Sequence, residues 1–414
     1  MSVFTRLSAL LTGLVLLGAC ATIPSGPPDP RPLTILISID GFRADYLDRG
    51  LTPTLSALAV SGARAAIRPS FPSKTFPNHY ALVTGLRPDR NGVVDNTMLD
   101  PRIPGVTFKM SDKAATADAR WWNQATPIWV TAERAGVRTA TMFWPGSDAA
   151  IQGVRPSQWK PFDQSQDPTQ RTDQLLAWLD IPLPERARFA TLYFDDVDTE
   201  GHHFGPDSPQ VNAAITKIDA AIRRLTAGLK ARGIEANLVI VADHGMAATS
   251  DDRTIFYDDL LPADAARTIG LGAFLSLYPN RGHDDQVAKA LLKPHAHMQC
   301  WRKQDIPARY HYGANPRVPP YVCLPQTGWL VSTRDYKPKW PERGAHGYDP
   351  AAPEMAALFI AEGPAFRRGV RLRAFDNVDV YPLLAWLIGV TPEANDGRLS
   401  EVARALALPA RLTQ

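Results

Sequence analysis

Apolar runs and helical periodicities alternate along this chain. Two runs rich in branched residues, 33–39 (LTILISI) and 237–242 (NLVIVA), predict strands buried on both faces. Weaker patterns of the same kind predict further strands over 63–67, 137–143, 188–193 and 354–361. Helical patterns cover 53–61, 76–84, 127–135 and 378–388.

The clearest helix begins at Ser208-Pro209, a capping residue followed by proline in the first turn, and ends before Gly233. Its apolar residues are spaced by three and four and mark one face: Val211, Ile215, Ile218, Ile222, Leu225 and Leu229. Strands that alternate with helices predict an α/β fold, with a doubly wound, mainly parallel central sheet flanked by helices. Shorter elements and many prolines over 251–340 predict a small inserted subdomain within a larger domain over 33–414.

Composition narrows the function classes. The 414 residues can bury a sizeable core, and the net charge of +3 comes without a run of Lys or Arg. We therefore expect no binding of nucleic-acid polymers through a basic face.

The N-terminus predicts export. Residues 1–19 have a positive flank and a short apolar core, as in a signal peptide. The sequence Leu17-Gly18-Ala19-Cys20 resembles a bacterial lipobox, which implies acylation of Cys20, a Pro-rich tether over 20–32 and a lipid anchor in the membrane. With Ala21 after the cysteine, we expect the periplasmic side of the outer membrane in a Gram-negative host. The alternative is a plain secretory signal and a periplasmic or secreted protein.

Cys300 and Cys323 lie 23 positions apart in the irregular region. In an oxidising compartment they could form a disulfide, and two buried thiols are an equal alternative.

Carboxylates and imidazoles stand in blocks at several predicted strand ends. Asp40 follows the first strand, and Asp243-His244 follows the strand 237–242. Asp198 and His202 are four apart, which on a compact turn directs both side chains toward one ion, although Asp195 and Asp196 are alternatives to Asp198. The last block is His346-Gly347, whereas His79, His203 and His311 have no such block and are expected to be ordinary histidines. Ligands bind beyond the carboxyl ends of parallel strands, and this residue set is typical of hydrolytic zinc sites.

Thr75 precedes Phe76-Pro77 at the start of a predicted helix. A helix N-terminus stabilises an anion such as an alkoxide or a phosphate, so Thr75 is a candidate nucleophile, with an ordinary N-cap as the alternative. Lys74 is expected to be a solvated surface lysine.

Taken together, these motifs resemble the nucleotide pyrophosphatase/phosphodiesterase family of the alkaline phosphatase superfamily. The resemblance covers most of the chain after the tether, and its parts are 39–43 (IDGFR), 71–96 (FPSKTFPNHYALVTGLRPDRNGVVDN), 198–202 (DTEGH) with Gly205-Pro206, 242–246 (ADHGM) and 346–347 (HG).

The resemblance implies an alkaline-phosphatase-like fold and two Zn²⁺ ions. By it, one ion would be held by Asp198, His202 and His346, and the other by Asp40, Asp243, His244 and the Thr75 oxygen. Thr75 would be the nucleophile, and Asn96 would donate a hydrogen bond to a phosphate oxygen. Phe76 would stack a nucleobase together with a second aromatic residue from a loop over 155–163, either Trp159 or Phe162.

The expected activity is hydrolysis of nucleotide phosphodiester or pyrophosphate bonds to nucleoside 5′-monophosphates through a phospho-threonine intermediate. One alternative is a choline-type phospholipid phosphodiesterase of the same family, which needs a cage for the ammonium group. A phosphomonoesterase is disfavoured by Thr75 and Asn96 in place of Ser and an Arg clamp. The remaining alternative is a lipoprotein that binds nucleotides without turnover.

Overall fold

The computed structural model describes residues 31–336 and 341–407. Its centre is a nine-stranded sheet in the order β18-β2-β17-β8-β1-β7-β5-β6, with β19 paired to β2. The strands are β1 (Leu33–Ile39), β2 (Ala63–Arg68), β5 (Thr139–Met142), β6 (Gln158–Trp159), β7 (Phe189–Phe194), β8 (Ala236–Val241), β17 (Ala357–Glu362), β18 (Val370–Arg371) and β19 (Phe375–Asp376).

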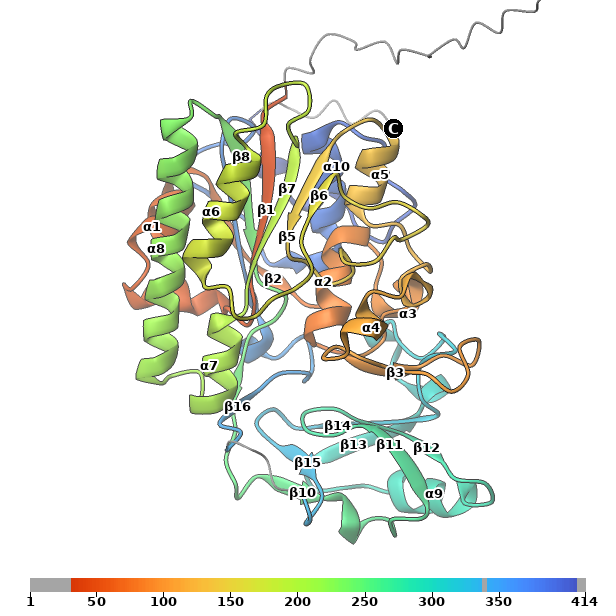
Figure 1. Ribbon diagram of the computed structural model, residues 1–414. Coiled ribbons are helices and arrows are strands. Elements are labelled where there is room, and N and C mark those ends of the chain that lie inside the picture. Colours follow the sequence, from red (N-terminus) through yellow and green to blue (C-terminus); the bar gives the residue numbers. More distant parts are fainter. Residues whose placement is uncertain (1–30, 337–340, 408–414) are drawn as a thin grey trace, which may run out of the picture. The chain divides into compact units, whose positions relative to one another are not determined.

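The sheet is mainly parallel, as predicted. β8, β1, β7, β5 and β6 run in one direction, and only β17 is antiparallel to its neighbours β2 and β8. All seven residues of β1 are buried, because helices cover both faces of the sheet. Figure 1 shows α1, α6 and α8 on one side of the sheet and α2, α5 and α10 on the other.

The predicted helices lie close to their expected bounds. They are α1 (Pro53–Ser61), α2 (Thr75–Thr84), α5 (Ile128–Arg134), α8 (Pro209–Ala231) and α10 (Val380–Ile388). The sequence did not predict the helices α3 (Pro88–Asn91), α4 (Lys113–Thr116), α6 (Pro168–Trp178), α7 (Asp196–Phe204) and α9 (Asp284–Leu291). In α8 the Ser208 side chain caps Val211 N, and all six residues of the predicted apolar face are buried. One prediction was wrong: Asp198 and His202 lie on helix α7 and not on a compact turn, with Gly205 as the C-cap residue.

Smaller sheets stand apart from the central one. A four-stranded sheet has the order β11-β12-β14-β13, with β11 (Ala266–Gly270), β12 (Leu275–Pro279), β13 (Met298–Arg302) and β14 (Tyr321–Pro325). Three two-stranded sheets pair β10 (Thr254–Phe256) with β15 (Leu330–Ser332), β9 (Ala247–Ala248) with β16 (Gly344–Ala345), and β3 (Thr97–Leu99) with β4 (Thr107–Lys109). The four-stranded sheet has its own buried apolar cluster, which includes Leu275, Val287 and Tyr321. This cluster supports an inserted subdomain over 251–340, which we retain as a proposal.

Cys300 and Cys323 face each other on the antiparallel strands β13 and β14 and form a disulfide. The structure thus chooses between the two alternatives that the sequence left open.

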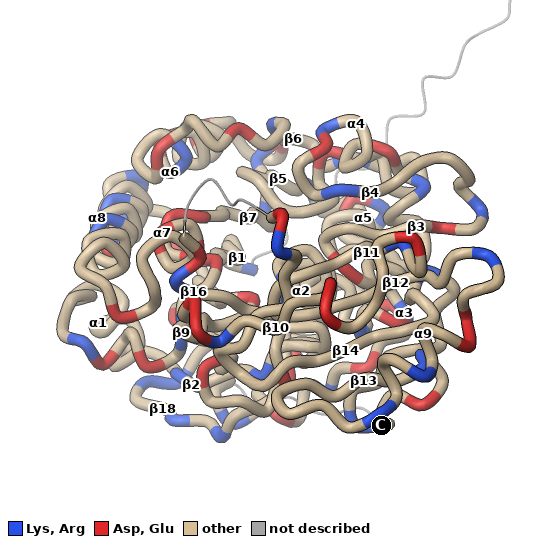
Figure 2. The backbone as a smooth tube through the Cα atoms, turned by 90° about the horizontal axis from the view of Figure 1, so that it is seen from below, with Lys and Arg blue, Asp and Glu red and all other residues tan. Residues whose placement is uncertain are grey.

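The predicted signal peptide over 1–19 and Cys20, the expected lipidation site, lie outside the described residues, as does the tether over 20–32 except for its last two positions. Among the helices that the structure describes, none is both long and apolar enough to cross a membrane. Figure 2 shows Lys and Arg interspersed with Asp and Glu over the face seen from below, which agrees with the absence of a basic run in the sequence.

Candidate active site

Two carboxylates lie at the ends of the central parallel strands. β1 pairs with β8 in a register that matches Ser38 to Val241, so Asp40 and Asp243 follow their strands at the same level. Both side chains are buried, and Asp243 Oδ1 accepts a hydrogen bond of 3.2 Å from Gly41 N. Gly41 has a φ of +68°, and a Cβ there would lie 3.0 Å from the Asp198 backbone. The glycine therefore lets α7 bring a third carboxylate close to the first two.

Three imidazoles are oriented by backbone carbonyls. His202 Nδ1 donates to Gly344 O, His244 Nδ1 to Gly245 O and His346 Nδ1 to Ser73 O, at 2.8 to 2.9 Å. A neutral imidazole that donates from Nδ1 carries a free lone pair on Nε2. Backbone carbonyls that fix the tautomer in this way are the usual support of metal-ligating histidines.

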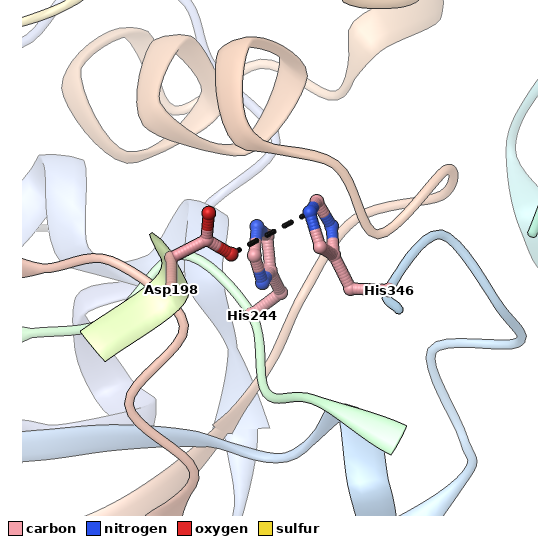
Figure 3. A group of neighbouring side chains, drawn as sticks. All are labelled: Asp198, His244 and His346. Carbon is pink, nitrogen blue, oxygen red and sulfur yellow. Dashed lines mark ion pairs between the residues drawn. The ribbon is translucent and has the colours of Figure 1, made fainter. Parts of the chain in front are cut away.

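The Nε2 atoms converge on the carboxylates. His202 Nε2 and His346 Nε2 each lie 3.6 Å from Asp198 Oδ1, and His244 Nε2 lies 2.9 Å from Asp243 Oδ2 and 3.4 Å from Asp40 Oδ1. The rings of His244 and His346 stack with centroids 3.5 Å apart, and Figure 3 shows both beside Asp198. The structure therefore brings the six carboxylates and imidazoles that were predicted to bind metal into one cluster.

Thr75 lies at the edge of this cluster. It is the first residue of α2, and its side chain is buried. Its Oγ1 lies 3.3 Å from His244 Nε2, while Lys74 takes the N-cap position without a side-chain capping bond. The hydroxyl of Thr75 therefore faces the imidazole and carboxylate cluster, and the alternative of an ordinary N-cap was wrong.

Asn96 lies beside the first turn of α2. Its Oδ1 accepts a hydrogen bond of 2.9 Å from Phe76 N. Because the amide oxygen is used by the backbone, the amide NH₂ is the group that can donate to a substrate.

The three aromatic residues expected to stack a nucleobase lie in different surroundings. Phe76 is partly buried against Phe108 and Trp122, with ring centroids 5.9 Å apart in each pair. The ring of Phe162 packs edge-on against that of Tyr193, with the two ring centroids 6.0 Å apart. The Tyr193 hydroxyl donates to Asp40 Oδ2 at 2.7 Å. Trp159 lies on the edge strand β6, with Arg155 over its ring. Only Phe162 of the two loop candidates is thus linked to the carboxylate cluster by described contacts.

Comparison with known proteins decides the family. The model of type I phosphodiesterase / nucleotide pyrophosphatase matches residues 34–349. The chain belongs to this family.

Three of the matching proteins align with this chain over most of their own length. An uncharacterized pyrophosphatase/phosphodiesterase of Schizosaccharomyces pombe is 40% identical over 88% of this chain and 78% of its own. A bis(5'-adenosyl)-triphosphatase of Xenopus laevis is 35% identical over 94% of this chain and 85% of its own. The structure of inactive murine ectonucleotide pyrophosphatase/phosphodiesterase 5 in complex with AMP aligns with a TM-score of 0.87, at 32% identity, over 91% of this chain and all of that one. These matches confirm the alkaline-phosphatase-like fold and a family-level function as a nucleotide pyrophosphatase/phosphodiesterase.

One residue of this phosphodiesterase was missed from the sequence. His79 is fully buried on α2, one turn after Thr75, and forms a group with Asp40 and Asp243. Its Nδ1 donates to Thr75 O at 2.9 Å and lies 3.3 Å from Asp243 Oδ2, while its Nε2 contacts Ser38 Oγ at 2.8 Å. Since both nitrogens have partners, His79 supports Asp243 and the start of α2. The four-residue step from Thr75 on a predicted helix was the signal that could have found it.

Several groups in the cluster have pKa values that are shifted far from their usual range. Burial, followed by repulsion from Asp243 and Asp198, raises the pKa of Asp40 well above its usual value. Burial alone would raise the pKa of Asp243, but His244 and His79 outweigh it and hold the pKa far below its usual value. Burial, and then His244 and His202, lower the pKa of His346 well below the usual value, which keeps this imidazole neutral and able to coordinate.

These residues fit a divalent metal ion of the kind on which the family depends. Asp40 Oδ1 and Asp198 Oδ1 are buried and have no hydrogen bond in the described structure. Buried carboxylate oxygens without donors are costly unless a cation compensates them. Oxygen and imidazole ligands from four separate segments are also the donor set that suits zinc.

Proposed function

We propose that this phosphodiesterase hydrolyses nucleotide phosphodiester or pyrophosphate bonds to nucleoside 5′-monophosphates, with Thr75 as the nucleophile and two Zn²⁺ ions as cofactors. The observation that carries the proposal is Thr75 Oγ1, which lies 3.3 Å from His244 Nε2 at the edge of the carboxylate and imidazole cluster. The relative named as a bis(5'-adenosyl)-triphosphatase and the neighbour in complex with AMP support a nucleotide substrate.

Two groups of residues would hold the metal ions. One group is Asp198, His202 and His346, and the other is Asp40, Asp243, His244 and the oxygen of Thr75. When bound, the ions would lower the pKa of the Thr75 hydroxyl, screen the phosphate charge and stabilise the leaving oxygen.

The chain's own residues carry out the transfer. Thr75 Oγ attacks phosphorus, the bond to the leaving alcohol or pyrophosphate breaks, and a phospho-threonine is formed. Water then attacks the phosphorus from the vacated side, which releases the nucleoside monophosphate and restores the hydroxyl. The NH₂ group of Asn96 donates to a phosphate oxygen, and this hydrogen bond strengthens as charge develops in the transition state.

Phe76 and Phe162 are proposed to hold the nucleobase. The ring contact of Phe162 with Tyr193, which reaches Asp40, supports Phe162 over Trp159. We also propose export through the segment 1–19 and anchoring through Cys20 at the periplasmic side of the outer membrane, from the lipobox resemblance alone.

Turnover of a substrate panel by wild type and Thr75→Ala tests this function. We expect wild type to release nucleoside 5′-monophosphates from p-nitrophenyl thymidine 5′-monophosphate and diadenosine triphosphate, and Thr75→Ala to lose at least about a thousandfold in kcat while it retains metal, because the attacking oxygen is gone. Thr84→Ala is the matched control, since Thr84 lies at the far end of α2 and its Oγ1 donates to Tyr80 O.

Two results would contradict the proposal. A preference for p-nitrophenyl phosphorylcholine over the nucleotides would favour the choline-type phosphodiesterase. Equal background rates for wild type and Thr75→Ala, with nucleotide binding retained, would favour a binding protein without turnover.

A further inference from the structure

A buried ion pair joins the two loops that carry the phosphate-binding residues. Lys74 directly precedes Thr75, and Asp95 directly precedes Asn96. Lys74 Nζ donates to Asp95 Oδ1 at 2.7 Å, with side chains that are only 13% and 3% exposed. The expectation of a solvated surface lysine was therefore wrong, because Asp95 is 21 positions away in the sequence.

Two further hydrogen bonds complete the connection. The same Asp95 Oδ1 accepts Asn96 N at 2.6 Å, and Asn96 Oδ1 accepts Phe76 N at 2.9 Å. Thr75 thus lies between two residues that are both bonded to the Asp95-Asn96 segment. A shift of Asp95 would change the separation between the Thr75 hydroxyl and the Asn96 NH₂ group.

The four-stranded sheet covers this ion pair. Lys74 Nζ lies 5.0 Å from the ring centroid of Phe274, just before β12. Asp95 Oδ2 is buried without a hydrogen bond in the described structure, as is Ser276 Oγ on β12. A Cβ on Gly270 of β11 would lie 3.2 Å from Phe274 O, 3.3 Å from Asp95 Oδ2 and 3.4 Å from Ser276 Oγ, so all three oxygens border this glycine.

We propose that Lys74 and Asp95 are positioning residues, and that their ion pair sets the spacing of Thr75 and Asn96 for phosphoryl transfer. The proposal rests on the proposed function. A buried ion pair adds little net stability, because desolvation offsets the attraction, but it fixes geometry. Misplacement of a catalytic group by about 1 Å can cost roughly a hundredfold in rate. Since Asp95 neutralises Lys74, the lysine acts on Asp95 and not on the substrate phosphate.

The kinetics of Lys74→Met, Asp95→Asn and the double variant test the proposal on p-nitrophenyl thymidine 5′-monophosphate. We expect each single variant to lose about 10- to 100-fold in kcat per folded molecule with KM within about threefold, because Thr75 and Asn96 act in the transition state. The double variant should be no slower than the slower single variant, because both changes break the same pair. Lys74→Arg, which keeps the pair, should retain at least about a third of kcat.

Gly270→Ala is a second kind of variant, because it keeps both Lys74 and Asp95. Its folding therefore does not depend on tolerating an unpaired buried charge. Its methyl group would press on Asp95 Oδ2 as well as on Phe274 O, and we expect about a threefold lower kcat with unchanged KM. Asp100→Asn is the matched control, because Asp100 follows the other end of β3 and belongs to a buried ion pair with Arg317. Its kcat per folded molecule should equal that of wild type.

The proposal is overturned if Asp95→Asn and Gly270→Ala keep wild-type kcat, if the losses of the single variants multiply in the double variant, or if Lys74→Met raises KM instead of lowering kcat. The last result would make Lys74 a substrate contact. An inactive wild type would overturn the proposed function and this positioning role with it, whereas an active wild type with unaffected variants overturns the positioning role alone.

Discussion

Two regions of this phosphodiesterase bury charged groups, and they treat them in opposite ways. Next to the C-terminal end of α3, Arg317 and Asp100 are each 1% exposed and pair at 2.6 Å. The guanidinium also donates to the carbonyl oxygens of Gly92, Trp121 and Arg120. In the carboxylate and imidazole cluster, Asp40 Oδ1 and Asp198 Oδ1 are buried without a hydrogen bond in the described structure.

The pKa shifts of the buried aspartates also differ in direction between the two regions. Burial raises the pKa of Asp100, but hydrogen bonds from Arg102 and Arg317 outweigh it, and the pKa falls below its usual value. The pKa of Asp40 rises instead, because burial and the neighbouring Asp243 and Asp198 all oppose its charge. A buried charge with all its partners present belongs to the scaffold, whereas one that lacks them indicates a missing cation.

Arg317→Met should have the largest effect on stability. Removal of the guanidinium leaves Asp100 with Arg102 as its remaining cationic partner and takes the donor from the carbonyl oxygens of Gly92, Trp121 and Arg120, so we expect the free energy of unfolding to fall by about 3–5 kcal/mol. The kcat per folded molecule should not change, because Arg317 contacts no active-site residue. Denaturant unfolding and steady-state kinetics measure the two quantities.

Arg232→Met is the matched control for this change. Arg232 pairs with Asp180 at the surface, with 30% and 59% of the side chains exposed, and its loss should cost less than about 1 kcal/mol. If Arg317→Met were as mild as this control, or if it lowered kcat, the contrast between the two regions would be lost.

Asp40→Asn should have a smaller effect, and its sign should depend on metal. In chelated protein we expect the variant to be more stable than wild type by about 1 kcal/mol, because one of three crowded carboxylates becomes neutral while the bond from Tyr193 is kept. In saturating zinc the order should reverse, because a metal ligand is lost. Thermal unfolding with chelator and with zinc measures both.

A variant that destabilises the protein equally in both conditions would mean that Asp40 is compensated by the chain itself. Asp180→Asn at the surface is the control, and its effect should be small and independent of metal.

Local patterns predicted the fold and most of the cluster. Asp40 and Asp243 come just after the buried strands β1 and β8. Because these strands pair in parallel, the two residues lie at the same edge of the sheet. The four-residue spacing of Asp198 and His202 predicted that both side chains point toward one site. They do so from a helix and not from the compact turn that we expected. What the sequence could not give depends on pairing between distant segments. His79 contacts Ser38 and Asp243, 41 and 164 positions away, and Lys74 meets Asp95 only because the chain turns back at α3.

The central claim is that the cluster of carboxylates and imidazoles holds two cations beside Thr75. Crystals of the wild-type protein prepared with zinc, measured on both sides of the zinc absorption edge, test it most directly. We predict two anomalous peaks, one in contact with Asp198, His202 and His346 and the other with Asp40, Asp243, His244 and Thr75 Oγ1. A cluster without anomalous peaks, or zinc bound only elsewhere on the chain, would contradict the account.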